Sequence, residues 1–303
     1  MVYDLMIVGG GTAGLTAALY ALRGGLSVLL LEGSAPGGQI ISTPSVDNYP
    51  ALPGLSGVDY AQKLLAQVHA LGLTMRYEQV LELSATGDIK TVRTKKAEYQ
   101  ARSIIWAAGV KPRLIGCPGE QRLTGRGVSY CATCDGALYR GRTVAVIGGG
   151  SAALTEALFL AGICHEVHLI HRRAEFRGEA ILADKVRAAG NIILHMQTVV
   201  AEIIGDKRVE KLRLRTGTAE RDLAVDGVFA AVGREPENAP LAVCIELDEQ
   251  GYVPAGEDCR TTQPGLFVAG DCRRKPLRQL VTAAADGAVA ATAAIEYLRL
   301  QER

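Results

Sequence analysis

Two glycine-rich turns, each directly after a short apolar run, restrict the possible folds of this chain more than any other feature. The first is GGGTAG over residues 9–14, and the second is GGGSAA over residues 148–153. A strand that ends in such a turn and continues as a helix is typical of the βαβ units that bind dinucleotides. Two such turns in 303 residues predict two parallel sheets, each covered by helices.

The first turn has the spacing of a site for an adenosine pyrophosphate. Gly9, Gly11 and Gly14 allow a tight turn, a close approach of the backbone to the phosphates, and close helix–strand packing. The helix predicted over residues 12–23 then directs the positive end of its dipole at the phosphates. Glu32 ends the next predicted strand, at about the offset where an acid accepts hydrogen bonds from a ribose diol.

The second turn repeats this pattern with alanine in the last position. Gly148, Gly150 and Ala153 are the equivalent residues, and Ser151 lies where the predicted helix begins. Strands predicted over residues 143–147 and 166–170 flank that helix. The second half of the chain therefore also predicts a dinucleotide site.

A basic segment ends the strand over residues 166–170, where the first half has an acid. It contains His171, Arg172, Arg173 and Arg177. Guanidinium groups bind a phosphate through paired hydrogen bonds, whereas a carboxylate would repel it. We therefore expect the second site to prefer NADPH over NADH; the alternative interpretation is a solvated basic loop.

Cys131 and Cys134 form a Cys-Ala-Thr-Cys segment shortly before the second glycine turn. Two residues of separation allow a tight disulfide, and a helix start at this point favours the thiolate. Asp135 follows directly and is placed to shuttle the proton that thiol exchange requires. A zinc site is the alternative, but it needs about four ligands. The remaining cysteines are scattered singly, and we interpret them as small buried apolar residues: Cys117, Cys164, Cys244, Cys259 and Cys272.

Composition narrows the cellular setting. The net charge of +1 provides no general attraction to nucleic acid or to a membrane surface. No apolar stretch reaches the ~18 residues of a membrane span, and the chain starts in a predicted strand rather than in a signal segment. Seven cysteines with a single close pair do not form a secreted disulfide framework. We expect a cytoplasmic protein with no metal, no nucleic acid and no membrane partner.

Segments rich in glycine and proline near residues 110–120 and 233–240 separate the two halves. We expect an α/β fold of two Rossmann-like, three-layer domains, the second inserted into the first. One domain comprises residues 1–112 and 241–303, and the other residues 113–240. Alternating polar and apolar residues over 75–103 predict a small antiparallel meander in the first domain, and a long helix is predicted over residues 280–298.

Taken together, these segments resemble the low-molecular-weight, bacterial-type thioredoxin reductases, which are pyridine nucleotide-disulfide oxidoreductases. The resemblance spans nearly the whole chain and includes GGGTAG, PGGQI, VDNYP, SYCATCDG, GGGSAA, HRRAEFR, GLFVAGD and LRQLVTAAADGA. It implies non-covalent FAD in the domain of both chain ends, and NADPH in the inserted domain that carries the cysteine pair. It also implies a homodimer that passes electrons from NADPH through FAD and the Cys131/Cys134 disulfide to oxidised thioredoxin.

The resemblance also implies roles for single residues. Cys134 is expected to face the flavin, Cys131 to exchange with the partner, and Asp135 to donate the proton. A clamp on the 2′-phosphate is implied for Arg172, Arg173 and Arg177. Further flavin contacts are implied for Gly38, Gln39, Asn48, Gly109, Asp271, Arg278 and Gln279.

One departure leaves the partner open. Ala137 and Leu138 stand where related sequences often carry aromatic residues at the partner-docking position. An enzyme of the same fold with another donor, such as ferredoxin, or with a non-thioredoxin dithiol or disulfide partner is the first alternative. A flavin-binding sensor or scaffold with a regulatory dithiol is the second. The intact GGGSAA and HRRAEFR segments favour NADPH.

Overall fold

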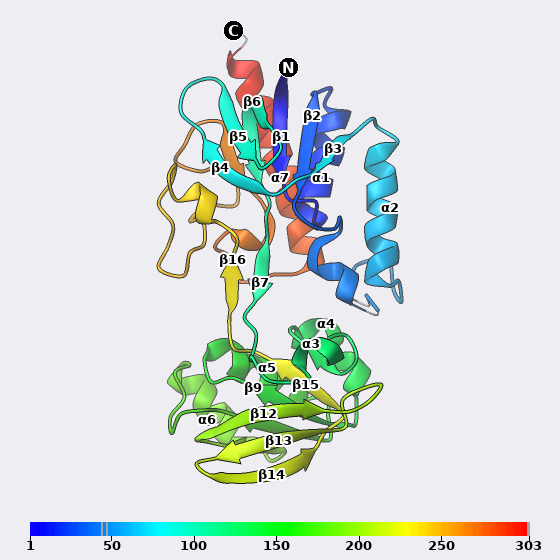
Figure 1. Cartoon of the computed structure of the whole chain (residues 1–303), viewed down its shortest axis with the longest axis vertical. Coiled ribbons are helices and arrows are strands. Elements are labelled where there is room, and N and C mark those ends of the chain that lie inside the picture. Colours follow the sequence, from blue (N-terminus) through cyan, green and yellow to red (C-terminus); the bar gives the residue numbers. More distant parts are fainter. Residues whose placement is uncertain (44, 47, 302–303) are drawn as a thin grey trace. The chain divides into compact units, whose positions relative to one another are not determined.

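The computed structural model describes residues 1–43, 45, 46 and 48–301, and the chain divides into two compact units (Figure 1). Unit 1 comprises Met1–Lys111 and Glu235–Arg303, and unit 2 comprises Pro112–Arg234. Both are built on parallel strands with helices packed against them. The expected α/β fold of two Rossmann-like units, one inserted into the other, is confirmed.

Unit 1 is built on a seven-stranded sheet of order β3-β2-β1-β6-β5-β4, with β17 beside β6. Its strands are β1 (Val2–Val8), β2 (Val28–Glu32), β3 (Thr74–Tyr77), β4 (Val80–Ser84), β5 (Lys90–Thr94), β6 (Glu98–Trp106) and β17 (Leu266–Val268). The antiparallel meander expected over residues 75–103 is confirmed for β4, β5 and β6, which pair antiparallel in that order, whereas β3 lies outside it. β3 pairs in parallel with β2, and the long strand β6 pairs with both β1 and β5, so that the antiparallel strands extend the main sheet.

Three helices of unit 1 are α1 (Thr12–Arg23), α2 (Gly57–His69) and α7 (Leu280–Gln301). Helices α1 and α7 lie side by side against the sheet (Figure 1). Their contact is very close, since a β-carbon at Gly287 would lie 2.3 Å from the carbonyl oxygen of Ala13. A residue with a side chain at position 287 would not fit here. Glycine at this position therefore allows α7 to pack directly against the start of α1.

Unit 2 has a parallel sheet of order β11-β10-β9-β15-β8. Its strands are β8 (Val128–Ser129), β9 (Thr143–Ile147), β10 (Glu166–Ile170), β11 (Ile192–His195) and β15 (Gly227–Ala230). Alternate residues of β9 face opposite sides. Val144 and Val146 pack with helices α5 (Ser151–Ala161) and α6 (Ala180–Ala188). Ala145 and Ile147 pack towards the antiparallel strands β12 (Thr198–Ile204), β13 (Lys211–Thr216) and β14 (Ala219–Ala224).

The chain passes between the units twice, through β7 (Val110–Pro112) and β16 (Arg234–Pro236), which pair with each other. Residues 235–240, which we expected in the inserted segment, belong to unit 1. The reason is local hydrogen bonding. The amide of Glu237 donates to the carbonyl of Gly109, and the side chain of Asn238 donates to the carbonyls of Gly251 and Cys272.

Short helical turns complete the fold. They are η1 (Gly38–Ser42), α3 (Glu120–Leu123), α4 (Ala132–Asp135), η2 (Gly136–Tyr139), η3 (Ala239–Leu241) and η4 (Gly270–Cys272). Within the described residues, no helix combines the length and the apolar character that a bilayer crossing demands.

Candidate active site

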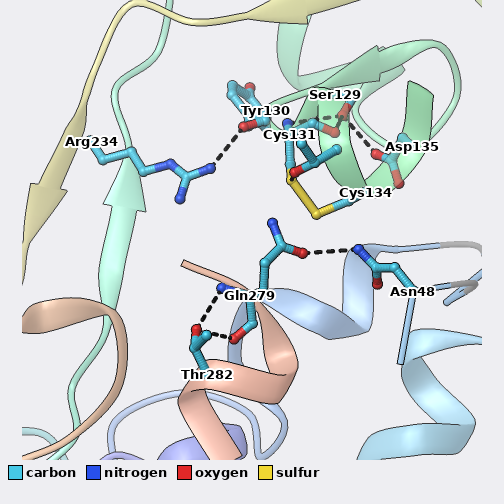
Figure 2. The surroundings of a disulfide bond; sticks show 10 residues. Asn48, Ser129, Tyr130, Cys131, Cys134, Asp135, Arg234, Gln279 and Thr282 are labelled. Atoms are coloured by element: carbon cyan, nitrogen blue, oxygen red, sulfur yellow. Dashed lines mark hydrogen bonds between the residues drawn. A yellow bond between two sulfur atoms is a disulfide. The ribbon is translucent and has the colours of Figure 1, made fainter. Parts of the chain in front are cut away.

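Cys131 and Cys134 form a disulfide in unit 2, with their Cα atoms 5.3 Å apart (Figure 2). Cys131 immediately precedes the short helix α4, and its carbonyl accepts the amides of Cys134 and Asp135 at 3.2 and 3.1 Å. Both cysteines are half-buried, while Thr133 between them is exposed. The loop is thus tightly folded and keeps the disulfide near the surface of its unit.

The carboxyl group of Asp135 lies beside this pair and is held by Ser129. The Ser129 hydroxyl donates to Oδ2 at 2.6 Å, whereas Oδ1 is buried without a hydrogen-bond partner among the described residues (Figure 2). Burial raises the pKa of Asp135, and the Ser129 hydrogen bond acts in the opposite direction. Asp135 therefore keeps its proton to a higher pH than an exposed aspartate, as a proton carrier for a dithiol must. Sequence reasoning assigned no role to Ser129, although it lies only two residues before Cys131.

In the first glycine turn, a side chain would have no room at Gly14 but would have room at Gly11. A β-carbon at Gly14 would lie 1.9 Å from the carbonyl oxygen of Gly9, whose φ is +102°. A β-carbon at Gly11 would meet nothing closer than 3.9 Å. Gly14 is thus required for helix packing, and the open space at Gly11 suits a phosphate. Beneath the turn, Glu32 accepts the amides of Gly10 and Ser34 at 2.6 and 2.7 Å.

Other residues of the expected flavin site make contacts within unit 1, and one pair of them adjoins this turn. Gly37, next to Gly38, forms a β-bridge with Gly11. The side-chain Nε2 of Gln39 donates to the carbonyl of Val110 at 2.6 Å, beside Gly109, whose φ is +73°. Two further contacts join residues of the expected site, and the first of them connects segments far apart in sequence. Asn48 donates to Gln279 at 2.9 Å (Figure 2), and Arg278 donates to the carbonyl of Asp271 at 3.2 Å. Asp47 of the VDNYP segment lies outside the described residues.

Asp286 of helix α7 fixes the loop that carries Asp271. Its Oδ2 accepts the amide of Gly270 at 2.9 Å. The same carboxylate pairs with Arg273 at 2.9 Å and Lys275 at 2.7 Å, and all three side chains are buried. Such a buried carboxylate is stabilised only while its cations remain in place. Asp286 is part of the LRQLVTAAADGA segment, and sequence reasoning assigned it no role.

The second glycine turn lies against the basic segment of unit 2. The carbonyl of Gly149 accepts the amide of Arg177 at 2.7 Å. Ala153 packs on Gly148, whose β-carbon would lie 2.7 Å from the alanine methyl, whereas a β-carbon at Gly150 would meet nothing within 4 Å. The hydroxyl of Ser151 accepts the amide of Glu179 at 3.1 Å.

Three arginines surround His171 at this turn. His171 is buried, and its pKa is lowered by that burial and by the neighbouring guanidinium groups of Arg177, Arg173 and Arg172. All three arginines are exposed. Across the part of the chain that the structure describes, none of them has a carboxylate partner. The turn therefore presents open backbone space beside unneutralised positive charge, as a phosphorylated nucleotide requires.

The remaining cysteines differ from the expectation in part. Cys164, Cys259 and Cys272 are buried as expected, but Cys117 and Cys244 are only half-buried. Both lie at the edges of hydrophobic clusters rather than inside them. Burial raises the pKa of Cys117 to about 11 and that of Cys259 and Cys272 to about 12, which makes them poor nucleophiles at neutral pH.

A family model, sequence relatives and solved structures all place this chain in one family. Residues 3–288 match the family described as "Pyridine nucleotide-disulphide oxidoreductase". The thioredoxin reductase of Peptoclostridium litorale is 41% identical over 306 residues, covering 98% of this chain and 97% of the relative. That of Listeria innocua is 40% identical, covering 98% and 94%. The crystal structure of thioredoxin reductase from Streptococcus pyogenes superposes with a TM-score of 0.95 at 38% identity, covering 99% of both chains.

Removing the Ser129 hydroxyl should change the titration of Asp135. We expect Ser129→Ala to raise the pKa of Asp135 further, because the hydroxyl donates to the ionised carboxylate. Carboxyl-carbon NMR of protein labelled at aspartate measures this shift, and the Asp4 resonance of unit 1 is the internal control. An unchanged Asp135 titration would show that Ser129 does not control this carboxyl.

Proposed function

We propose that this chain, which belongs to the pyridine nucleotide-disulphide oxidoreductase family and within it to the thioredoxin reductases, reduces thioredoxin through Cys131 and Cys134. Electrons pass from NADPH through FAD and this disulfide to oxidised thioredoxin. The observation that carries the proposal is the half-buried Cys131–Cys134 disulfide beside the proton-retaining Asp135. It lies in the same unit as the second glycine turn and the three exposed arginines beside that turn.

Unit 1 is proposed as the FAD-binding domain. Gly9, Gly11 and Gly14 would hold the pyrophosphate, since the space at Gly11 is open, and Glu32 would hold the ribose. Residues assigned to the remainder of the cofactor are Gly38, Gln39, Asn48, Gly109, Asp271, Arg278 and Gln279. FAD, when bound, supplies a carrier that accepts a hydride from a nicotinamide and delivers two electrons to a disulfide.

Unit 2 is proposed as the NADPH-binding domain. Its glycine turn, with Gly148, Gly150, Ser151 and Ala153, would hold the pyrophosphate at the start of helix α5. The neighbouring arginines, supported by the buried His171, would hold the 2′-phosphate. The site fits this ligand because the backbone space at Gly150 is open and the guanidinium groups have no acidic partner among the described residues.

Thiol exchange with the partner follows from the roles proposed for the two cysteines. The Cys131 thiolate attacks one sulfur of the partner disulfide and forms a mixed disulfide, releasing one partner thiol. Cys134 then attacks the Cys131 sulfur, releases the second partner thiol and restores the Cys131–Cys134 disulfide. The two protons of the reduced pair end on the two partner thiols, and Asp135 transfers one of them.

The activity has a direct test. We expect the FAD-loaded protein to oxidise NADPH in the presence of oxidised thioredoxin, and Cys131→Ser or Cys134→Ser to reduce turnover to background. Cys244→Ser is the matched control, because that thiol belongs to unit 1 and not to the redox-active pair, so the variant should retain full turnover. Thioredoxin reduction by both active-site variants at the unmutated rate would refute the proposal. Flavin reduction by ferredoxin but not by NADPH would favour the alternative donor.

The preference for NADPH over NADH tests whether the arginines after β10 bind the 2′-phosphate. A charge-assisted contact contributes roughly 1.5–3 kcal/mol, so Arg172→Ala or Arg177→Ala should narrow the preference for NADPH over NADH by about ten- to a hundred-fold. Steady-state kcat/KM for both nucleotides measures the ratio. Arg208→Ala, at an exposed arginine of the same unit, should leave it unchanged. Equal use of both nucleotides by the unmutated protein would contradict the proposed clamp.

We further propose a cytoplasmic homodimer. A single close thiol pair among otherwise reduced cysteines suits a reducing compartment. For the dimer, unit 1 presents a groove of about 470 Å³ lined by Tyr20, Leu52, Tyr60 and Val281. Tyr20 and Val281 are 47% and 41% exposed, and such an apolar face is typical of a subunit contact.

The proposed dimer can be dissociated at this face. We expect Val281→Asp to shift the protein to a monomer in sedimentation velocity, because a charge replaces an apolar contact. Val243→Asp is the control, since Val243 is 79% exposed and lies outside the groove. A protein that is monomeric before mutation, or a dimer that Val281→Asp leaves intact, would exclude this interface.

A further inference from the structure

Four side chains form a continuous hydrogen-bonded chain in unit 2, and neither the sequence motifs nor the proposed exchange steps use them. They are Glu166 and His168 on β10, His195 at the end of β11, and Arg221 on β14. Oε1 of Glu166 lies 2.9 Å from Nε2 of His168, and Nδ1 of His168 lies 3.0 Å from Nε2 of His195. Nδ1 of His195 lies 2.6 Å from Nη2 of Arg221. Both histidine rings are buried.

The two ends of this chain determine where its protons lie. A guanidinium can only donate, so Nδ1 of His195 accepts from Arg221, and the ring carries its own proton on Nε2. That Nε2 donates to Nδ1 of His168, whose proton therefore also lies on Nε2 and is donated to the Glu166 carboxylate. Both rings are thus neutral and in one defined tautomer, and every ring nitrogen has a partner.

A further proton can enter this chain only if a hydrogen bond breaks. Charged groups face the rings from two strands, Glu166 from β10 and Arg221 from β14. Burial lowers the pKa of His195 to about 4, and His168 and Arg221 act in the same direction. Burial also lowers the pKa of His168, although Glu166 opposes this effect. The rings therefore remain neutral at pH 7 and link the three strands.

The end of β11 and the turn after it hold the basic segment that follows β10. The carbonyl of His195 accepts the amide of His171 at 2.9 Å. In the turn, the amides of Gln197 and Thr198 donate to the carbonyls of Arg173 and His171 at 3.1 and 3.0 Å. Gln197 has a φ of +54°, which residues other than glycine seldom adopt, so its surroundings hold this turn in place. His195 thus connects the buried chain to the backbone of the proposed 2′-phosphate site.

We propose that His195 is a positioning residue for NADPH: the hydrogen-bonded chain from Glu166 to Arg221 fixes the end of β11, and β11 fixes the arginines after β10 in the arrangement that binds a 2′-phosphate. This inference rests on the proposed NADPH site of unit 2. A displacement of about 1 Å is enough to weaken a contact that depends on exact placement. Because NADH has no 2′-phosphate, loosening this segment weakens the binding of NADPH and not that of NADH.

Two substitutions and a matched control test this role. His195→Phe removes both hydrogen bonds of the ring but leaves the charge of Arg221 in place. Arg221→Ala removes only the bond to Nδ1 of His195. Arg215→Ala is the control, because it removes an exposed arginine of the neighbouring strand β13 that is not part of the chain. Isothermal titration calorimetry of the FAD-loaded proteins with NADP⁺ and with NAD⁺ measures binding without turnover.

The expected losses are confined to the phosphorylated nucleotide. His195→Phe should weaken NADP⁺ binding by about ten-fold and Arg221→Ala by about three-fold, as the loss of two hydrogen bonds and of one predicts. Both variants should bind NAD⁺ as the unmutated protein does. Arg215→Ala should match the unmutated protein with both nucleotides.

The proton positions have a separate measurement that needs no variant. Hydrogen–nitrogen NMR correlations of protein labelled with ¹⁵N-histidine should show Nε2 protonated and Nδ1 unprotonated in both His168 and His195 at pH 7. The exposed His69 of unit 1 is the reference signal. In Arg221→Ala, His195 should take up a proton at a pH about one unit higher, because Nδ1 loses its donor and the neighbouring positive charge.

The inference and the proposed function fail in different ways. Unchanged NADP⁺ binding by His195→Phe would overturn the inference, and so would an equal loss of NADP⁺ and NAD⁺ binding. A proton on Nδ1 of either ring at pH 7 in the unmutated protein would also overturn it, even if His195→Phe does not fold. An unmutated protein that binds NADP⁺ no more tightly than NAD⁺ would instead refute the proposed NADPH site.

Discussion

The structure depends on how closely each nucleotide-loop helix approaches the strand before it. In unit 1, the carbonyl oxygen of Gly9 occupies the space that a β-carbon of Gly14 would need. In unit 2, Ala153 makes a similar but looser contact with Gly148. This close packing brings helix amides to the carboxyl edge of each sheet, where open backbone space suits a phosphate. The carboxyl edges of the two sheets differ in charge, because Glu32 lies at the edge in unit 1 and the arginines after β10 lie at the edge in unit 2.

Buried carboxylates serve two different purposes in the two units. Asp286 in unit 1 lies between Arg273 and Lys275, so its charge is neutralised and it holds a loop in place. Asp135 and Glu156 in unit 2 each have one buried oxygen without a partner among the described residues, and burial raises the pKa of both. The first arrangement stabilises a fixed structure. In Asp135, which follows Cys134 directly, the second arrangement leaves proton binding responsive to the state of the disulfide.

Sequence patterns predicted the local elements well where one physical signal dominated. The helix over residues 12–23 and the strands over residues 143–147 and 166–170 have the predicted bounds, because a glycine turn or an apolar run defines their ends. The meander over residues 75–103 was confirmed for β4, β5 and β6, but β3 pairs in parallel with β2, since alternation reports which faces are buried but not which strand is the neighbour. The position of residues 235–240 was wrong. Hydrogen bonds from Glu237 and Asn238, which no local pattern records, join that segment to unit 1.

The sequence by itself determined the chemistry, because glycine spacing, a cysteine pair and a run of arginines are local signals with a direct physical meaning. The tertiary structure alone decided which side chains support that chemistry. Ser129 contacts Asp135 six residues further along the chain, and Asn48 contacts Gln279 231 residues further along. Such contacts depend on how helices and loops pack together, and a hydrogen bond contributes only when both partners are brought within about 3 Å of each other.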